Sequence, residues 1–167
     1  RFISGTHAPH IALEKKLAEF MVREAAMIFS SAYVTSMGVL VPLCTPETVY
    51  VSDELNHNCI IQAMRLSRPA GKFIYKHNDM GDLERVLKEW DNKAERIIII
   101  TDGVFSMDGN VAPMDKINEL AKKYDALIMV DECHSAGVVG KTGRGVTELF
   151  NIRGEVDIIT GTLGKAF

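Results

Sequence analysis

The sequence predicts an α/β fold in which helices cover both faces of a mostly parallel β-sheet. Short apolar runs alternate along the chain with segments whose apolar residues recur at helical spacing. The runs are nearly continuous in apolar residues, as expected for parallel strands that are buried on both faces. The chain shows no internal repeat, low-complexity segment or linker, so we expect a single domain.

The helices are expected where apolar residues share one face or where a helix-stopping residue follows. In the first, fourth and last helix the inward residues are three or four positions apart. The second and third helices precede Pro46 and Pro69-Ala70-Gly71, which favour a helix end. In chain order, the expected helices cover residues 9–21, 33–43, 56–66, 80–90 and 114–124.

The strands are expected where an apolar run is too short for most helices. Ile97 to Ile100 is the clearest example, and Ala126 to Val130 is another. Because helices separate these runs, the strands are expected to be parallel neighbours in one sheet. In chain order, the expected strands cover residues 25–29, 48–52, 72–76, 96–101, 126–130 and 156–159.

Composition excludes several classes of protein. The chain of 167 residues is 47% hydrophobic with a net charge of −3, and it has neither a basic patch nor an apolar stretch long enough to span a bilayer. Nucleic acid and membranes are therefore not expected as partners. Its three cysteines have no zinc-finger spacing, so no metal site is expected. Free thiols favour a reducing compartment, and we expect a cytoplasmic protein.

Lys165 and Asp131 are the most informative candidates for a functional site. Each follows an apolar run that is expected to be a buried strand. Groups just beyond the carboxyl ends of parallel strands lie where open α/β sheets bind ligands. A lysine amine, a carboxylate and His134 three residues beyond it suit pyridoxal phosphate (PLP) chemistry. The ordinary alternatives are a solvated surface lysine and an aspartate that caps a helix.

Other polar residues are expected near the same edge of the sheet. The turn at Ala32 and Tyr33 begins a helix, where free backbone N–H groups can bind an anion. His57 and Ser106 each follow a strand, and Thr162 precedes Lys165. An aromatic ring could stack on His57, and a phosphate could accept a hydrogen bond from Thr162. Capping and turn roles remain open for all of these residues.

Residues of this region also allow three other interpretations. Cys133 next to His134 suggests a Cys/His protease, but adjacent side chains on an extended backbone point in opposite directions. The cluster from Asp131 to His134 resembles a set of metal ligands, but fits no standard zinc pattern. Lys141-Thr142 ends a near-match to a phosphate-binding P-loop. Gly143-Arg144-Gly145 follows at once and disfavours the helix that such a loop requires.

Taken together, the motifs resemble the α-oxoamine synthase family of fold-type I PLP enzymes. The resemblance covers the whole chain and rests on the order of several short motifs. They are Ser4-Gly5-Thr6-His7, Asp53-Glu54-Leu55-Asn56-His57, Gly103 to Gly109, Asp131 to Gly137, Gly143-Arg144-Gly145 and Thr162-Leu163-Gly164-Lys165.

The resemblance implies a role for each candidate residue. Lys165 is the internal aldimine lysine and the base that moves the Cα proton, and Asp131 pairs with the pyridine nitrogen. His57 stacks on the ring and contacts substrate, and His134 lies near the ring hydroxyl. Cofactor contacts also come from Ser106, from Thr162 at the phosphate, and from the backbone amides of Ala32 and Tyr33. The implied reaction joins an amino acid to the acyl group of an acyl-CoA.

The motifs also suggest a branch of the family. Thr101 to Gly109 and Val156 to Ala166 look most like glycine C-acetyltransferase (2-amino-3-ketobutyrate CoA ligase), whereas Ala32 to Ser36 departs from that branch. Glycine and acetyl-CoA are thus the expected substrates. The alternatives are an 8-amino-7-oxononanoate synthase-like or other α-oxoamine synthase using a longer acyl-CoA, and a non-catalytic partner subunit.

The resemblance bears on domain organisation as well. Residues 1–167 would be the PLP-binding large domain of a longer protein, with an N-terminal arm and a C-terminal domain elsewhere. Family members are homodimers whose subunits share their active sites, so we expect a homodimer. The isolated segment is expected to be inactive.

Overall fold

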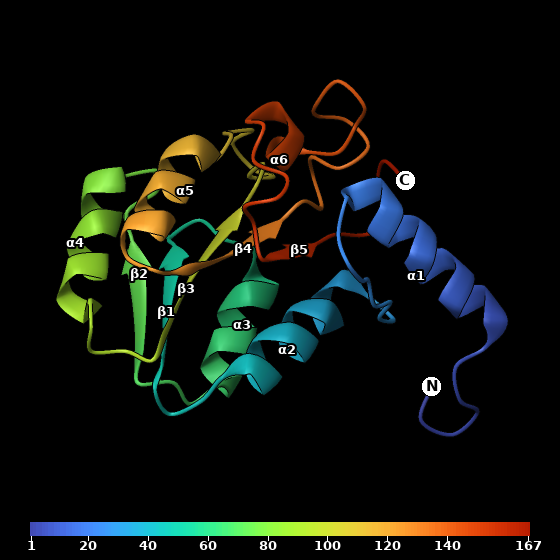
Figure 1. Ribbon diagram of the computed structural model, residues 1–167, viewed down its shortest axis with the longest axis horizontal. Helices are drawn as coiled ribbons and strands as arrows, with labels where there is room; N and C mark the ends of the chain where they lie inside the picture. The colour runs from blue at the N-terminus through green and yellow to red at the C-terminus, as the bar shows by residue number, and fades with distance from the viewer.

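A five-stranded, fully parallel sheet forms the centre of the protein. The computed structural model describes all residues from 1 to 167, and the strand order across the sheet is β2-β1-β3-β4-β5 (Figure 1). All four strand pairings are parallel, which confirms the predicted fold class. The strands are β1 (Thr48–Asp53), β2 (Gly71–Tyr75), β3 (Arg96–Asp102), β4 (Leu127–Asp131) and β5 (Ile158–Thr160).

Helices cover both faces of this sheet. The helices α4 and α5 lie on one face, α2 and α3 lie on the other, and α1 lies at the end of the molecule beyond β5 (Figure 1). No helix combines the length and the apolar character needed to cross a bilayer. The helices are α1 (Ala8–Met21), α2 (Ala32–Leu43), α3 (Asn58–Leu66), α4 (Met80–Trp90), α5 (Met114–Lys123) and α6 (Val146–Leu149).

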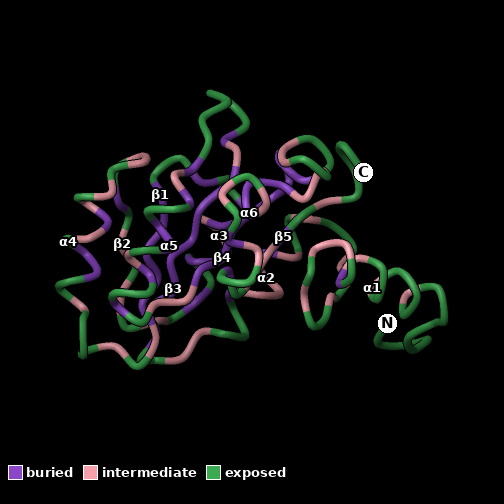
Figure 2. The backbone as a smooth tube through the Cα atoms, turned by 45° about the horizontal axis from the view of Figure 1, so that its top comes forward, coloured by how far each residue is buried: buried purple, intermediate pink, exposed green.

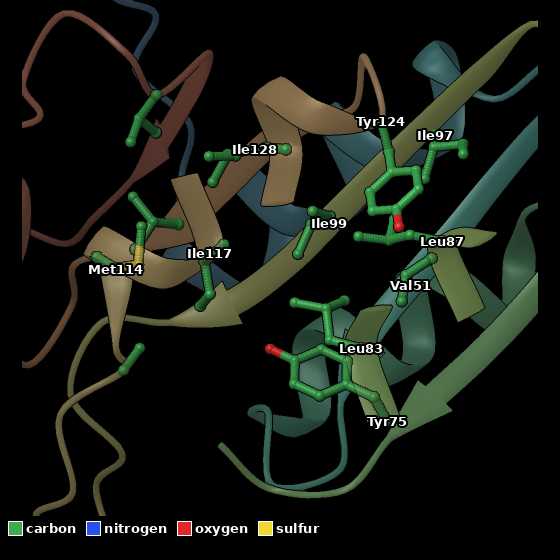
Figure 3. Close-up of a cluster of buried hydrophobic side chains, with 14 of the residues drawn as sticks. Val51, Tyr75, Leu83, Leu87, Ile97, Ile99, Met114, Ile117, Tyr124 and Ile128 are labelled. Atoms are coloured by element: carbon green, nitrogen blue, oxygen red, sulfur yellow. The ribbon is translucent and has the colours of Figure 1, made fainter. Parts of the chain in front are cut away.

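Two apolar clusters hold the layers together. Ile99 of β3 packs with Leu83 of α4 and Ile117 of α5 in the larger cluster (Figure 3). Ile98 of β3 belongs to the second cluster, with Ile60 of α3. Successive side chains of a strand point to opposite faces, so β3 is buried on both sides and requires a continuous apolar run. Figure 2 shows the buried strands in the centre and the exposed turns around them.

The strand predicted over residues 25–29 is wrong. This segment forms neither a helix nor a strand, and it is not paired with any strand of the sheet. The backbone N–H of Ile28 instead donates to the carboxylate of Glu14 in α1, at 2.9 Å. A hollow lies between this segment and residues 157–164. The latter range contains β5 and the four residues after it. The apolar run therefore packs beside the sheet without joining it.

Three polar residues stand in register at the carboxyl edge of the sheet. Asp102 of β3 is the partner of Asp131 of β4, which is the partner of Thr160 of β5. Residues in register on parallel strands point to the same face of the sheet. The side chains two positions earlier, Ile100 and Met129, belong to the cluster under α2 and α3. The polar row therefore faces the starts of these two helices.

Candidate functional site

A single pocket at this edge brings together most of the predicted site residues. It encloses about 340 Å³, part of which is open to solvent. The starts of α2 and α3, the ends of β3 and β4, and the segment after β5 all contribute to its wall. The predicted residues that line it are Ala32, Tyr33, His57, Asp131, His134 and Lys165.

Two predicted residues lie outside the wall of this pocket. Thr162 lines the neighbouring hollow, which Ala32 also lines, and its hydroxyl accepts a hydrogen bond from the backbone N–H of Gly164 at 3.2 Å. Ser106 is exposed on the loop that follows β3. From that loop it is Val104, two residues earlier, that reaches the pocket wall.

Asp131 is a buried carboxylate at the floor of the pocket. Only 5% of it is exposed, and its Oδ1 accepts a hydrogen bond from the backbone N–H of Cys133 at 2.8 Å. A charge with so little solvation is costly unless a partner compensates it. The position therefore suits a cationic or hydrogen-bond-donating group bound in the pocket.

The thiol of Cys133 is not suited to act as the nucleophile of a Cys/His protease. Burial, and then the charge of Asp131, raises the pKa of Cys133 well above its ordinary value, so the thiol stays protonated. The His134 ring forms a hydrogen bond with Lys165 and none with Cys133. The structure therefore argues against the Cys/His alternative.

Lys165 and His134 meet at the mouth of the pocket. The Nζ of Lys165 lies 3.0 Å from the Nε2 of His134. Partial burial, and then the charge of Lys165, lowers the pKa of His134. The imidazole is therefore neutral at neutral pH, and its Nε2 can accept a hydrogen bond from the lysine amine.

His57 caps α3, and this fixes the orientation of its ring. Its Nδ1 accepts a hydrogen bond from the backbone N–H of Cys59 at 3.2 Å. In a neutral imidazole the other nitrogen, Nε2, then carries the proton. The backbone N–H of His57 donates to Oδ2 of Asp102 at 3.2 Å. Both the ring and the backbone of His57 are thus anchored beside the pocket.

The start of α2 presents free donors to the pocket. The hydroxyl of Ser31 accepts a hydrogen bond from the backbone N–H of Val34 at 3.2 Å. No such acceptor serves the backbone N–H groups of Ala32 and Tyr33, two residues that line the pocket. The start of a 12-residue helix with two free donors is suited to an anion such as a phosphate.

Glu132 anchors the Gly-rich segment that follows β4. Its side chain is fully buried and accepts a hydrogen bond from the hydroxyl of Ser135. The same carboxylate accepts backbone N–H bonds from Val146 and Thr147, at 3.0 and 3.1 Å. Glu132 thereby joins the turn that carries His134 to the start of α6.

The P-loop alternative does not fit this segment. Lys141 and Thr142 lie in turns and do not begin a helix. The backbone N–H and the hydroxyl of Thr142 both donate to the carboxylate of Glu148, at 2.9 and 2.6 Å. A carboxylate therefore occupies the donors that a phosphate would need.

Four residues of the pocket wall are not among the site residues that the sequence predicts. They are Cys59, Asp102, Val104 and Cys133. A signal for Asp102 was available, because it follows the apolar run Ile97 to Ile100 much as Asp131 follows its own run. The two cysteines and Val104 carry no such signal, since their place depends on how the neighbouring turns fold.

Comparison with known proteins identifies the family. The family model named aminotransferase class I and II matches residues 1–167. The chain belongs to this family. Similar curated proteins include the 8-amino-7-oxononanoate synthases of Bacillus velezensis, 52% identical over 166 residues, and of Thermoanaerobacter pseudethanolicus, 51% identical over 166 residues. Both matches cover 99% of this chain and 42% of the relative, so the chain spans less than half the length of these relatives.

Solved structures of other proteins share the fold of this chain. Serine palmitoyltransferase from S. paucimobilis with a bound PLP–myriocin aldimine matches with a TM-score of 0.94 at 29% identity, covering 99% of this chain and 42% of that one. The 8-amino-7-oxononanoate synthase of Francisella tularensis matches with a TM-score of 0.82 at 29% identity, covering 97% and 46%. Both names are among the α-oxoamine synthases that the motifs resemble.

We predict that Gly145→Ala strongly destabilises the protein. Gly145 has a φ of 81°, and a Cβ at this position would occupy the space of the Glu132 carboxylate. Backbone strain and a displaced buried carboxylate together should lower the free energy of unfolding by about 3 kcal/mol or more. Urea unfolding measures the change. The control is Gly154→Ala, whose Cβ would meet no atom within 4 Å and which should stay within about 0.5 kcal/mol of wild type.

We also predict that Lys165→Met raises the pKa of His134. The substitution removes the positive charge that opposes protonation of the imidazole, whereas the burial of the ring remains. NMR titration of the cofactor-free protein should therefore move the His134 midpoint toward the ordinary histidine value without reaching it. Lys141→Met, in the exposed turn, is the matched control. An unchanged midpoint in Lys165→Met would contradict the assignment of the charge effect.

Proposed function

We propose that residues 1–167 form the PLP-binding large domain of an α-oxoamine synthase, a PLP-dependent C-acyltransferase. The observation that carries this proposal is the single pocket that contains Asp131, His134, His57 and Lys165 together. The family match and the relatives support it. Because the chain spans 42% of those relatives, the activity proposed is that of the whole protein.

The residues present fit this cofactor. A buried carboxylate, Asp131, suits the pyridine nitrogen, and the free N–H groups of Ala32 and Tyr33 suit the phosphate. Two buried oxygens of the polar row, Oδ1 of Asp102 and Oγ1 of Thr160, have no hydrogen-bond partner in the protein. Buried polar atoms are nearly always paired, so unpaired oxygens at this edge are consistent with a bound molecule that completes the site.

When bound, PLP supplies an electron sink for the negative charge that develops at the amino acid Cα. Lys165 supplies the amine that would hold the cofactor covalently and, once displaced, would move a proton at the Cα. His134 is neutral and can accept a hydrogen bond from that amine, which aims it into the pocket. Asp131 would hold a proton on the pyridine nitrogen, and the anchored ring of His57 would form one wall against the cofactor.

The two residues outside the pocket wall keep their expected roles as proposals. Thr162 lies beside the start of α2, in the hollow that shares Ala32 with the pocket, and this placement supports a contact with the phosphate. Ser106 would have to approach from the exposed loop after β3. Its contact with the cofactor stays a prediction.

The comparisons favour the 8-amino-7-oxononanoate synthase branch over glycine C-acetyltransferase. The relatives at about half identity carry the former name. That name describes an amino ketone that ends in a methyl group. It would form when the acyl group of a long dicarboxylic acyl-CoA is joined to the Cα of alanine, with the alanine carboxyl group leaving as CO2 and the thioester releasing CoA. We therefore propose alanine and a long acyl-CoA as substrates, in place of glycine and acetyl-CoA. The homodimer and the cytoplasmic location stay predictions.

The cofactor assignment predicts a visible absorbance band in the full-length protein purified with PLP. Lys165→Ala should abolish the lysine-linked band and lower the rate of CoA release by about a thousandfold or more. Absorbance spectra and a thiol assay for CoA provide the measurements. Lys141→Ala, which removes an exposed lysine of the Gly-rich segment, should change neither. A wild-type protein with no PLP band would refute the proposal.

The substrate assignment is tested separately with the same protein. Acyl-CoA thioesters of increasing length are offered with glycine, alanine or serine, and CoA release is followed. We expect the largest kcat/KM with alanine and a long dicarboxylic acyl-CoA. A preference for glycine and acetyl-CoA would contradict this substrate assignment and favour the glycine C-acetyltransferase branch. The cofactor assignment would not be affected.

A further inference from the structure

Asp102 is a second buried carboxyl group in the pocket, beside Asp131. Only 6% of it is exposed, and it lines the same pocket as Asp131 and Lys165. It ends β3 and pairs in register with Asp131 at the end of β4. Their side chains therefore lie on neighbouring strands and point to the same face of the sheet.

A hydrogen-bond network holds Asp102 in place. Its backbone N–H donates to the side-chain oxygen of Asn56 at 2.8 Å. The amide nitrogen of Asn56 donates in turn to the hydroxyl of Ser52 and to the carbonyl of Ile100, each at 2.8 Å. Oδ2 of Asp102 accepts from the backbone N–H of His57. Asp102 thus links β3 to the residue that caps α3.

The other oxygen of the same carboxyl group, Oδ1, has no partner. It is buried and makes no hydrogen bond to any group of the protein. Leaving a buried polar atom unpaired costs free energy, and such atoms are rare in folded proteins. Because the carboxyl group is fixed through its backbone and Oδ2, the side chain cannot turn away to solvent. Because Asp102 lines the pocket, a molecule bound there is the partner that we infer for Oδ1.

The surroundings of Asp102 favour its uncharged form. Burial, and then the charge of Asp131, raises the pKa of Asp102 to about 8. Asp53 at the end of β1 acts in the same direction, whereas the backbone N–H of His57 and the charge of Lys165 oppose it. Tyr75 of β2 is also near, and it stays neutral because burial raises its own pKa well above the ordinary value. At neutral pH Asp102 is therefore mostly protonated.

We propose that Asp102 is a further binding residue of the cofactor site, holding the backbone of His57 through Oδ2 and donating a hydrogen bond from a protonated Oδ1 to the bound cofactor. The two carboxyl groups then have different tasks. Asp131 is the anion that balances a positive charge, and Asp102 is a neutral acid that donates. Neighbouring carboxyl groups divide in this way when their environments separate them. The inference rests on the proposed function for the identity of the bound molecule.

The location of the proton is tested on the cofactor-free, full-length protein by infrared difference spectroscopy. A protonated carboxyl group has a carbonyl band that a carboxylate lacks. The wild-type protein should show such a band at pH 6 and lose it as the pH rises through about 8. Asp102→Asn should remove the band, whereas Asp53→Asn should keep it, because both oxygens of Asp53 are already bonded to His77, Leu55 and Asn78. A band unchanged by Asp102→Asn would overturn the inference.

The hydrogen bond is tested by measuring the affinity for PLP at pH 7 from the absorbance of the bound cofactor. Asp102→Asn is uncharged and keeps both an acceptor and a donor, so its affinity should stay within about threefold of wild type. Asp102→Ala removes both and should bind PLP about tenfold more weakly. Circular dichroism checks that both variants are folded, and the asparagine variant keeps the test valid if the alanine variant is not.

The outcomes separate the two proposals. Unchanged affinity in a folded Asp102→Ala would show that Oδ1 makes no contact with the cofactor, and would overturn the inference. If Asp102→Asn lowers the affinity for PLP as much as is expected for Asp102→Ala, the charged form of Asp102 is needed for binding. This result would also overturn the inference. A wild-type protein that binds no PLP would refute the proposed function, whereas the infrared result would still decide whether Asp102 carries the proton.

Discussion

The parallel register of β3, β4 and β5 is the constraint on which the site depends. It places Asp102, Asp131 and Thr160 in one row at the carboxyl edge of the sheet. The row is possible because the same strands are buried on both faces by apolar side chains, which fix the register through packing. A shift of one residue in β4 would turn Asp131 toward the opposite cluster. The apolar core therefore determines where the polar groups of the pocket stand.

Much of the fold could be predicted because each strand is a short, nearly continuous apolar run. The helix predicted over residues 80–90 has the observed bounds of α4, since Leu83, Val86 and Leu87 share one buried face. Residues 25–29 are an apolar run that does not form a strand. An apolar run reveals that a segment is buried or packed, but the partner of its backbone is a property of the folded chain. Here that partner is the carboxylate of Glu14, which no local pattern announces.

In the site, too, some residues could be predicted from local sequence, whereas others depend on contacts between distant parts of the chain. Lys165, Asp131 and His134 could be found because each stands at the end of a strand or shortly after one, and the topology brings strand ends together. Glu132 was overlooked because its role depends on donors from Val146 and Thr147, which are distant in sequence. Asp102 had the same sequence signal as Asp131 but no recognised role. Its importance becomes visible only when the unpaired oxygen and the neighbouring carboxylate are seen in one pocket.

The pairing of two carboxyl groups also explains why the pocket can hold so many polar groups without a large charge. If both Asp102 and Asp131 were ionised, two adjacent negative charges would lie in a largely buried site with Lys165 as the cation that lines it. The proposed proton on Asp102 would remove one of these charges and leave Asp131 as the anion beside Lys165 in the lining of the pocket. The cofactor site can then present an acceptor at the end of β4, a donor at the end of β3 and an amine in the segment after β5.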